Sequence, residues 1–220
     1  MKAIILVSGG MDSCVTASVA KADGHDLSFM HMNYGQRTEN RELKAFHDIA
    51  DHYVIDERLI VDISHLSAIG GSCLTDNNIA IPNANLDNLD IPVSYVPFRN
   101  ANILSVAVSW AEVIKATTLY VGAVEEDSSG YPDCRRSFFD AFEETTNTGT
   151  KPETNIKIVT PLITLTKKEI VEKGISLNTP LHLTWSCYKN EDIPCKKCDS
   201  CALRFKGFLQ AGVKDPLFHS

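Results

Sequence analysis

The chain has 220 residues, 44% of them hydrophobic, and a formal net charge of −7 at pH 7. This length suits one α/β domain with an appendage better than two large domains, and the composition supports an ordinary globular core. The acidic balance argues against a large nucleic-acid interface, which a basic face would mark, and favours a small-molecule substrate.

No apolar stretch of the sequence approaches the roughly 20 residues of a membrane span. The apolar run at the start of the chain ends too early, at Ser8, for a signal peptide. We therefore expect a soluble, cytoplasmic protein without a membrane partner. Four of the seven cysteines cluster at metal-ligand spacing, which argues against a disulfide framework.

The first predicted elements are a buried strand over residues 3–7 and a helix that runs to about residue 22. Between them lies Ser8-Gly9-Gly10-Met11-Asp12-Ser13. Its glycines can take positive φ and let backbone N–H groups approach an anion, and Asp12 or Ser13 is a good N-cap. The lysine of a P-loop is absent from the motif. The motif predicts a phosphate-binding turn; the alternative is an ordinary glycine-rich connection.

A second strand over 26–33 ends in Tyr34-Gly35-Gln36-Arg37, and a helix over 39–51 and a third strand over 53–61 follow. This β-α-β-α-β series predicts a Rossmann-like open parallel sheet with right-handed crossovers and helices on both faces. Ligands of such sheets bind beyond the carboxyl ends of the strands, so Arg37 is expected beside the first turn, where it would meet phosphate or carboxylate. The alternative is a turn whose arginine is merely solvated.

Residues 62–97 show no periodicity, which indicates a functional insertion or a lid. A helix over 101–115 follows, and Arg99 and Asn100 are expected at its N-terminus, where an anion is favoured. Asn100 is explained equally well as an N-cap and as a ligand contact.

A fourth strand over 117–121 leads into a loop that contains Asp127 and Gly130-Tyr131-Pro132-Asp133-Cys134-Arg135. Acidic and basic groups alternate in this loop at the carboxyl end of a strand, which is a natural substrate or metal site. The rest of the pattern predicts a helix, a strand and a helix, over 138–146, 156–159 and 167–173.

A cluster of four thiols near the C-terminus is the second strong signal. Cys187 is followed by two Cys-x-x-Cys steps that share Cys198, one from Cys195 and one to Cys201. This spacing matches a closed tetrahedral zinc site, which would stabilise a short segment that has little core of its own. A redox-active Cys-x-x-Cys is the alternative.

Together these motifs resemble the 7-cyano-7-deazaguanine synthases, a queuosine-pathway family of the ATP pyrophosphatase superfamily. The turn at residues 8–13 is shared across that superfamily, whereas the Gly-Tyr-Pro-Asp-Cys-Arg loop and Trp185-Ser186-Cys187-Tyr188 are much narrower signals. Thr38 stands where the family often has histidine, so it is given no catalytic role. Lys196 stands where glycine is common, and the spacing of the thiols is unchanged.

The resemblance implies that 7-carboxy-7-deazaguanine and ammonia are converted to 7-cyano-7-deazaguanine through an adenylated acid and an amide. ATP, with Mg²⁺, would be cleaved between its α and β phosphates. The resemblance also implies one structural zinc, no direct contact with nucleic acid, and a homodimer. An ATP pyrophosphatase-type domain is expected over residues 1–180 and a zinc-binding subdomain over residues 181–220.

The site residues implied by the resemblance fall into three groups. Pyrophosphate would be held by the turn and the start of its helix: Ser8, Gly9, Gly10, Met11, Asp12, Ser13 and Cys14. Asp12 would also carry Mg²⁺; the candidate phosphate or carboxylate clamps are Arg37, Arg99 and Arg135, and Asp127 and Asp133 are candidates for Mg²⁺ or for the N–H edge of the deazaguanine ring. The zinc ligands would be Cys187, Cys195, Cys198 and Cys201.

Two other functions fit parts of the pattern. One is a tRNA-modifying ATP pyrophosphatase with Cys134 as a persulfide carrier, against which the acidic charge argues. The other is a non-catalytic nucleotide-binding module, or an interaction module stabilised by zinc.

Overall fold

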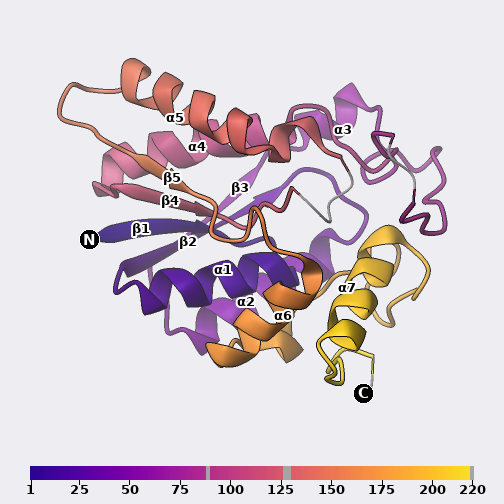
Figure 1. The fold of residues 1–220 in the computed structure, drawn as a ribbon. Coiled ribbons are helices and arrows are strands. Elements are labelled where there is room, and N and C mark those ends of the chain that lie inside the picture. The colour runs from indigo at the N-terminus through magenta and orange to yellow at the C-terminus, as the bar shows by residue number, and fades with distance from the viewer. Residues whose placement is uncertain (88–89, 126–129, 219–220) are drawn as a thin grey trace.

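A five-stranded parallel sheet in the order β3-β2-β1-β4-β5 forms the centre of the computed structural model, which describes residues 1–87, 90–125 and 130–218 (Figure 1). Strand order reverses between β1 and β4, and the carboxyl ends of strands at such a switch point are where ligands of open α/β sheets bind. The strands are β1 (Lys2–Leu6), β2 (Asp26–Asn33), β3 (Arg58–Asp62), β4 (Thr118–Val121) and β5 (Lys157–Val159).

Helices cover both faces of this sheet, with α1 and α2 on one face and α4 and α5 on the other (Figure 1). The described helices are α1 (Met11–Ala22), α2 (Glu39–His52), α3 (His65–Ile69), α4 (Arg99–Ile114), α5 (Arg136–Gly149), α6 (Lys167–Ser176) and α7 (Asp199–Gln210), with short 3₁₀ turns η1 (Pro132–Cys134) and η2 (Leu181–Leu183).

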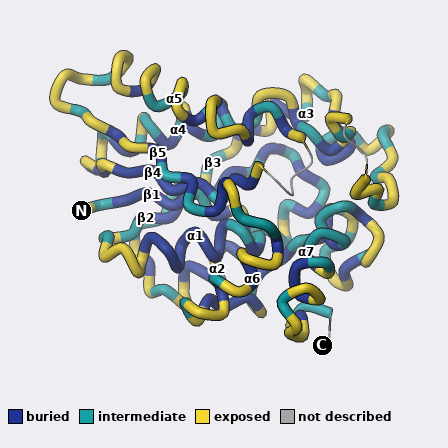
Figure 2. The backbone as a smooth tube through the Cα atoms, viewed as in Figure 1, coloured by how far each residue is buried: buried dark blue, intermediate teal, exposed yellow. Residues whose placement is uncertain are grey.

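The side chains of β1 alternate between the two layers. Ile4 packs in a buried cluster with Leu104 of α4 and Phe139 of α5, whereas Ala3 and Ile5 belong to the cluster formed with α1 and α2. All three β1 residues are fully buried, as a central strand covered on both faces requires. Figure 2 shows the same arrangement as a buried sheet inside helices whose outer surfaces are exposed.

The predicted Rossmann-like parallel sheet with helices on both faces is confirmed, but some local predictions are wrong. β3 begins at Arg58 rather than at residue 53, because α2 continues through His52 and Val54 takes φ of 57° in the turn that follows. The insertion over 62–97 is not wholly irregular, since it contains α3. Helix α7 is an element that the sequence pattern did not predict. Among the described residues, no helix combines the length and the apolar character that crossing a membrane requires.

The C-terminal arm, residues 181–218, has more packing than the sequence suggested. Phe208 of α7 lies in one buried cluster with Ile170 and Val171 of α6. A Cβ added at Gly207 would lie 2.9 Å from the carbonyl oxygen of Lys167, so the two helices touch backbone to backbone at this point. The arm is therefore held to the α/β layers through α6.

Arg204 of α7 is the buried polar centre of the arm. Its side chain is 1% exposed and forms two hydrogen bonds to Asp215, from Nε to Oδ2 at 2.7 Å and from Nη2 to Oδ1 at 2.9 Å. Arg204 Nη1 also donates to Thr184 Oγ1 at 2.6 Å, and Nη2 donates to the carbonyl oxygen of Leu181 at 3.3 Å. One guanidinium thus joins α7, η2 and the C-terminal segment.

Asp215→Ala is expected to lower the free energy of unfolding by about 3–5 kcal/mol, because the arginine charge would stay buried without its carboxylate. The control is Glu172→Ala, which removes the half-exposed Lys168–Glu172 pair at 3.6 Å and should cost no more than about 1 kcal/mol. Urea unfolding at matched metal content measures both. Equal losses in the two variants would contradict this role for Arg204.

Candidate functional site

The turn after β1 needs glycine at its second position. Gly9 has φ of +85°, and a Cβ there would lie 2.6 Å from the carbonyl oxygen of Glu42 on α2. The carbonyl oxygen of Gly9 accepts a hydrogen bond from the backbone N–H of Trp185 at 2.9 Å. The turn is therefore fixed between α2 and the C-terminal arm.

The N-terminus of α1 faces the space beyond the strands. Gly10, rather than the predicted Asp12 or Ser13, is the N-cap, and its φ of −80° shows that only Gly9 uses the positive-φ freedom of glycine. A Cβ at Gly122, just after β4, would lie 3.0 Å from the backbone nitrogen of Ser13, so the end of β4 closely approaches the first turn of α1. A helix N-terminus in this position favours an anion.

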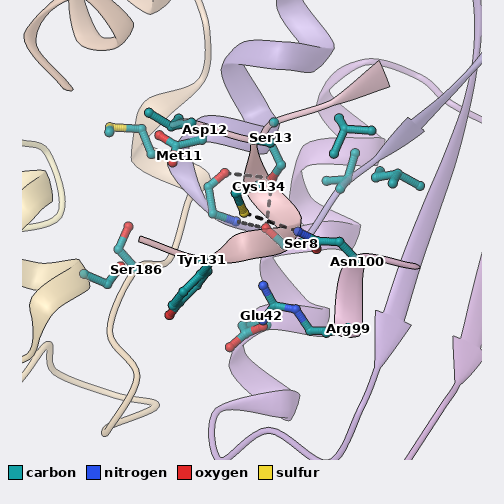
Figure 3. Close-up of a pocket in the computed structure, with 18 of the residues that line it drawn as sticks. Ser8, Met11, Asp12, Ser13, Glu42, Arg99, Asn100, Tyr131, Cys134 and Ser186 are labelled. Carbon is teal, nitrogen blue, oxygen red and sulfur yellow. Dashed lines mark hydrogen bonds between the residues drawn. The ribbon is translucent and has the colours of Figure 1, made fainter. Parts of the chain in front are cut away.

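A cavity of about 290 Å³ lies at the carboxyl ends of β1, β2 and β4 (Figure 3). The turn and α1 form one side of it, α4 and the loop before η1 another, and the C-terminal arm a third. Its polar and aromatic lining includes Ser8, Asp12, Ser13, Tyr34, Glu42, Arg99, Asn100, Tyr131, Cys134, Lys167, Ser186 and Tyr188, and Gly10 lines it through its backbone.

Asp12 and Lys167 form an ion pair in the wall of this cavity, with Lys167 Nζ 2.6 Å from Asp12 Oδ2. Asp12 Oδ1 is buried and has no hydrogen-bond partner among the described residues. A buried, unpaired carboxylate oxygen suits a divalent cation or a ligand donor.

Lys167 was not among the site residues predicted from the sequence. A capping box fixes its place at the start of α6, with Glu169 N donating to Thr166 Oγ1 and Thr166 N donating to Glu169 Oε2. The Thr-x-x-Glu spacing is visible in the sequence, but the pairing of Lys167 with Asp12 joins residues 155 positions apart.

Arg99 and Glu42 lie close together in the part of the cavity near Tyr34 (Figure 3). Arg99 Nη1 donates to Tyr34 Oη at 3.2 Å, and its guanidinium lies 5.1 Å from the centre of that ring. Glu42 Oε1 accepts from Thr38 Oγ1 at 2.6 Å, and Oε2 accepts from Gln36 Nε2 at 3.3 Å. Burial raises the pKa of Glu42 to about 7, although both hydrogen bonds and the Arg99 charge act in the opposite direction. Glu42, an acid in an ordinary amphipathic helix, gave no signal in the sequence.

Several predicted site residues do not line the cavity. Arg37 Nη2 instead donates to the carbonyl oxygens of Asp76 and Ile79 at 2.7 and 2.6 Å, which holds the insertion in place. Arg135 is exposed, at the N-cap of α5. Cys14 is buried on the core side of α1, where burial raises the pKa of its thiol to about 12.

Asp133 is engaged in holding α4. Its Oδ2 accepts the backbone N–H of Asn100 at 2.9 Å, and its carbonyl oxygen accepts from Asn100 Nδ2 at 2.8 Å. The N-cap of α4 is therefore Phe98 and not Asn100. The side chain of Asn100 already has a protein partner in Asp133. Asp127 lies outside the described residues.

The four C-terminal cysteines can hold a metal ion. All seven cysteines of the chain are free thiols, and the Sγ atoms of Cys187, Cys195, Cys198 and Cys201 all lie within 4.8 Å of one another. Backbone N–H groups point at these sulfurs, with Cys195 N donating to Cys187 Sγ at 3.3 Å and Cys198 N donating to Cys195 Sγ at 3.4 Å. Such donors stabilise the thiolate form that a metal requires, so the residues fit the group that the sequence predicted.

A family model described as queuosine biosynthesis protein QueC matches residues 2–212. The chain belongs to this family. It is 59% identical to a 7-cyano-7-deazaguanine synthase of Chlorobium phaeobacteroides and 57% identical to one of Chloroherpeton thalassium, each over 99% of this chain and 96% of the relative. The family that the sequence motifs resemble is therefore confirmed.

Solved structures similar to this chain confirm the fold at low sequence identity. A 4-thiouridine synthetase in complex with RNA and bound ATP matches with a TM-score of 0.55 and 18% identity, over 96% of this chain and 50% of that one. The U34-tRNA thiolase NcsA from Methanococcus maripaludis, which holds a [4Fe-4S] cluster, matches with a TM-score of 0.52 and 17% identity, over 86% of this chain and 60% of that one. These likenesses place the QueC-family chain in the ATP pyrophosphatase-type fold.

Cys198→Ser is expected to abolish metal binding by the cluster and to lower thermal stability at the same time, because three thiolates no longer close a tetrahedral site. Cys73→Ser is the matched control, since Cys73 is equally buried but lies outside the cluster. Metal analysis and thermal unfolding of both variants give the readout. A Cys198→Ser protein with full metal content, or with no metal and unchanged stability, would contradict a structural metal site.

Proposed function

We propose that the chain converts 7-carboxy-7-deazaguanine and ammonia to 7-cyano-7-deazaguanine, with consumption of ATP, in queuosine biosynthesis. The observation that carries the proposal is one cavity that is lined both by residues of the Ser8–Ser13 turn and by Arg99 and the carboxylate of Glu42 (Figure 3). Support also comes from relatives of that name at 55–59% identity along nearly the whole chain.

The first half of the proposed reaction forms an amide. A carboxylate is a poor electrophile, so one of its oxygens attacks the α-phosphorus of ATP, and pyrophosphate leaves. The resulting acyl adenylate is attacked at its carbonyl carbon by ammonia. AMP leaves with the former carboxylate oxygen, a proton is lost, and the amide remains.

The second half converts the amide to the nitrile. The amide oxygen attacks the α-phosphorus of a second ATP, and pyrophosphate again leaves. Loss of AMP together with the protons on nitrogen forms the carbon–nitrogen triple bond. The same cavity serves both halves, because each one places an oxygen of the deazaguanine substituent against an α-phosphorus.

Within this scheme the turn and α1 hold the leaving pyrophosphate. Backbone N–H groups at a helix N-terminus suit that charge, and Lys167 supplies the cation that the motif itself lacks. Mg²⁺ would accompany ATP, and Asp12 Oδ1 is the oxygen available to it. Arg99 remains a candidate for binding the substrate. Arg37 and Arg135 do not line the cavity, so their predicted roles as clamps have no support.

A thiol-transfer reaction on tRNA is less well supported. Burial raises the pKa of Cys134 to about 11, so its thiol stays protonated at neutral pH and is a poor nucleophile. The net charge of −7 also disfavours an RNA footprint.

We assign the thiol cluster to one structural zinc. A tetrahedral Zn–S₄ site with bonds of about 2.3 Å places its sulfurs about 3.8 Å apart, which the spacing within 4.8 Å accommodates. Four thiolates leave no open position for water, so the ion would stabilise the arm rather than take part in the reaction. The proposal also includes a boundary near residue 180 between the ATP-binding domain and this arm. It further includes a homodimer and a cytoplasmic location.

Lys167→Ala is expected to reduce the formation of AMP and pyrophosphate by about 100-fold or more. The substitution removes a positive charge that would stabilise the negative charge developing on the leaving pyrophosphate. Lys168→Ala is the matched control, because the next lysine is half-exposed and pairs only with Glu172 among the ion pairs of the described chain. Asp12→Ala should abolish both products. The metal content of all three variants should equal that of the wild type.

Product analysis by chromatography and mass spectrometry measures these effects with 7-carboxy-7-deazaguanine, ATP and ammonium as reactants. Formation of ADP by the wild-type protein would overturn the proposed cleavage at the α-phosphorus. Equal activity of Lys167→Ala and Lys168→Ala would overturn the role of Lys167.

A further inference from the structure

We propose that Glu42 and Arg99 read the pyrimidine edge of the deazaguanine ring, with Arg99 donating to the ring carbonyl oxygen and Glu42 accepting from N1–H and the 2-amino group. This inference rests on the proposed function, and it assigns the residues that select the base within the same cavity.

Glu42 has acceptor positions to spare. A carboxylate has two oxygens with two lone-pair positions each, and Thr38 and Gln36 occupy one position on each oxygen. One acceptor per oxygen is therefore left for a ligand. Two parallel acceptors match two parallel N–H donors, which is the geometry of the N1–H and 2-amino groups of a guanine ring.

The packing of α2 keeps this carboxylate in place. The carbonyl oxygen of Glu42 would lie 2.6 Å from a Cβ at Gly9, so the first turn of α2 is in contact with the phosphate-binding turn. Thr38 and Gln36 orient the side chain from the preceding loop. The acceptor pair is thus preorganised relative to the place assigned to ATP.

Arg99 supplies the donor that completes the pattern. It lines the cavity next to Glu42, is oriented by its bond to Tyr34 Oη, and has N–H groups beyond the one used there (Figure 3). Guanine presents, in order, one acceptor and two donors along this edge, and the protein presents one donor and two acceptors. The two patterns are complementary at each of the three positions.

The same pattern rejects adenine. An adenine ring presents an N6 donor, an N1 acceptor and no amino group at position 2, so the carboxylate would face a lone pair and the arginine a donor. The Glu42–Arg99 end of the cavity is therefore assigned to the deazaguanine, and the base of ATP lies elsewhere. Asp133, the described acid that the sequence suggested for this edge, is occupied at the N-terminus of α4.

The burial of the Glu42 carboxylate supports this assignment. The raised pKa of Glu42, about 7, reports an ionised form that is poorly solvated in the free protein. Two N–H donors from a ligand would replace the missing solvation, so part of the binding free energy comes from completing the shell of this carboxylate.

The test compares 7-carboxy-7-deazaguanine with its analogue that lacks the 2-amino group. In the wild-type protein the analogue should have a kcat/KM at least 100-fold lower, because a buried acceptor loses its donor. Glu42→Gln, which replaces an acceptor by a donor at constant shape, should raise the KM for the true substrate by about 50-fold or more. It should reduce the discrimination to below about 10-fold, while the KM for ATP stays unchanged.

Glu39→Gln is the matched control, because Glu39 lies one turn earlier on α2 and does not line the cavity. Calorimetric titration of 7-carboxy-7-deazaguanine into each protein without ATP provides a second measurement that does not need turnover. Metal content and thermal unfolding verify that Glu42→Gln is folded.

The possible outcomes separate the two proposals. If the wild-type protein does not turn over 7-carboxy-7-deazaguanine, the proposed function fails and this inference with it. If it does, and Glu42→Gln keeps the 2-amino discrimination or raises only the KM for ATP, the base-reading role of Glu42 alone is overturned.

Discussion

The contact of Gly9 with α2 and the C-terminal arm is the constraint on which the rest of the site depends. At this residue the backbone turns with positive φ, lies against the carbonyl oxygen of Glu42 and accepts a hydrogen bond from Trp185. A Cβ cannot be accommodated there without moving α2. One glycine therefore sets the distance between the Ser8–Ser13 turn, the carboxylate of α2 and the arm.

The thiol cluster acts on the cavity through the chain that carries it. Ser186, Cys187 and Tyr188 line the cavity, and Cys187 is also one of the four clustered thiols. A metal ion bound there would hold this segment, together with Trp185, against the turn. The buried Arg204–Asp215 pair also secures this arm. The thiol cluster thus fixes one wall of the cavity in which the reaction is proposed.

Sequence reasoning recovered the features that depend on local pattern. The apolar run before the turn, the alternation of strands and helices and the Cys-x-x-Cys steps each follow from neighbouring residues, and the sheet and thiol cluster formed as predicted. Lys167 and Glu42 were missed because their positions depend on contacts between distant segments. Arg37 was predicted to lie in the cavity because it follows a strand end. Its guanidinium instead donates hydrogen bonds to two carbonyl oxygens of the insertion. A motif fixes where a backbone lies more reliably than where a long side chain points.

We propose that the two oxygens of the 7-carboxylate attack the α-phosphorus of ATP in turn, one in each half of the reaction. The most direct measurement is mass spectrometry of AMP formed from 7-carboxy-7-deazaguanine labelled with ¹⁸O at both oxygens of its carboxyl group. Two molecules of AMP for each nitrile, each carrying one ¹⁸O atom, are the predicted result. Unlabelled AMP, or label found in phosphate or pyrophosphate, would contradict it.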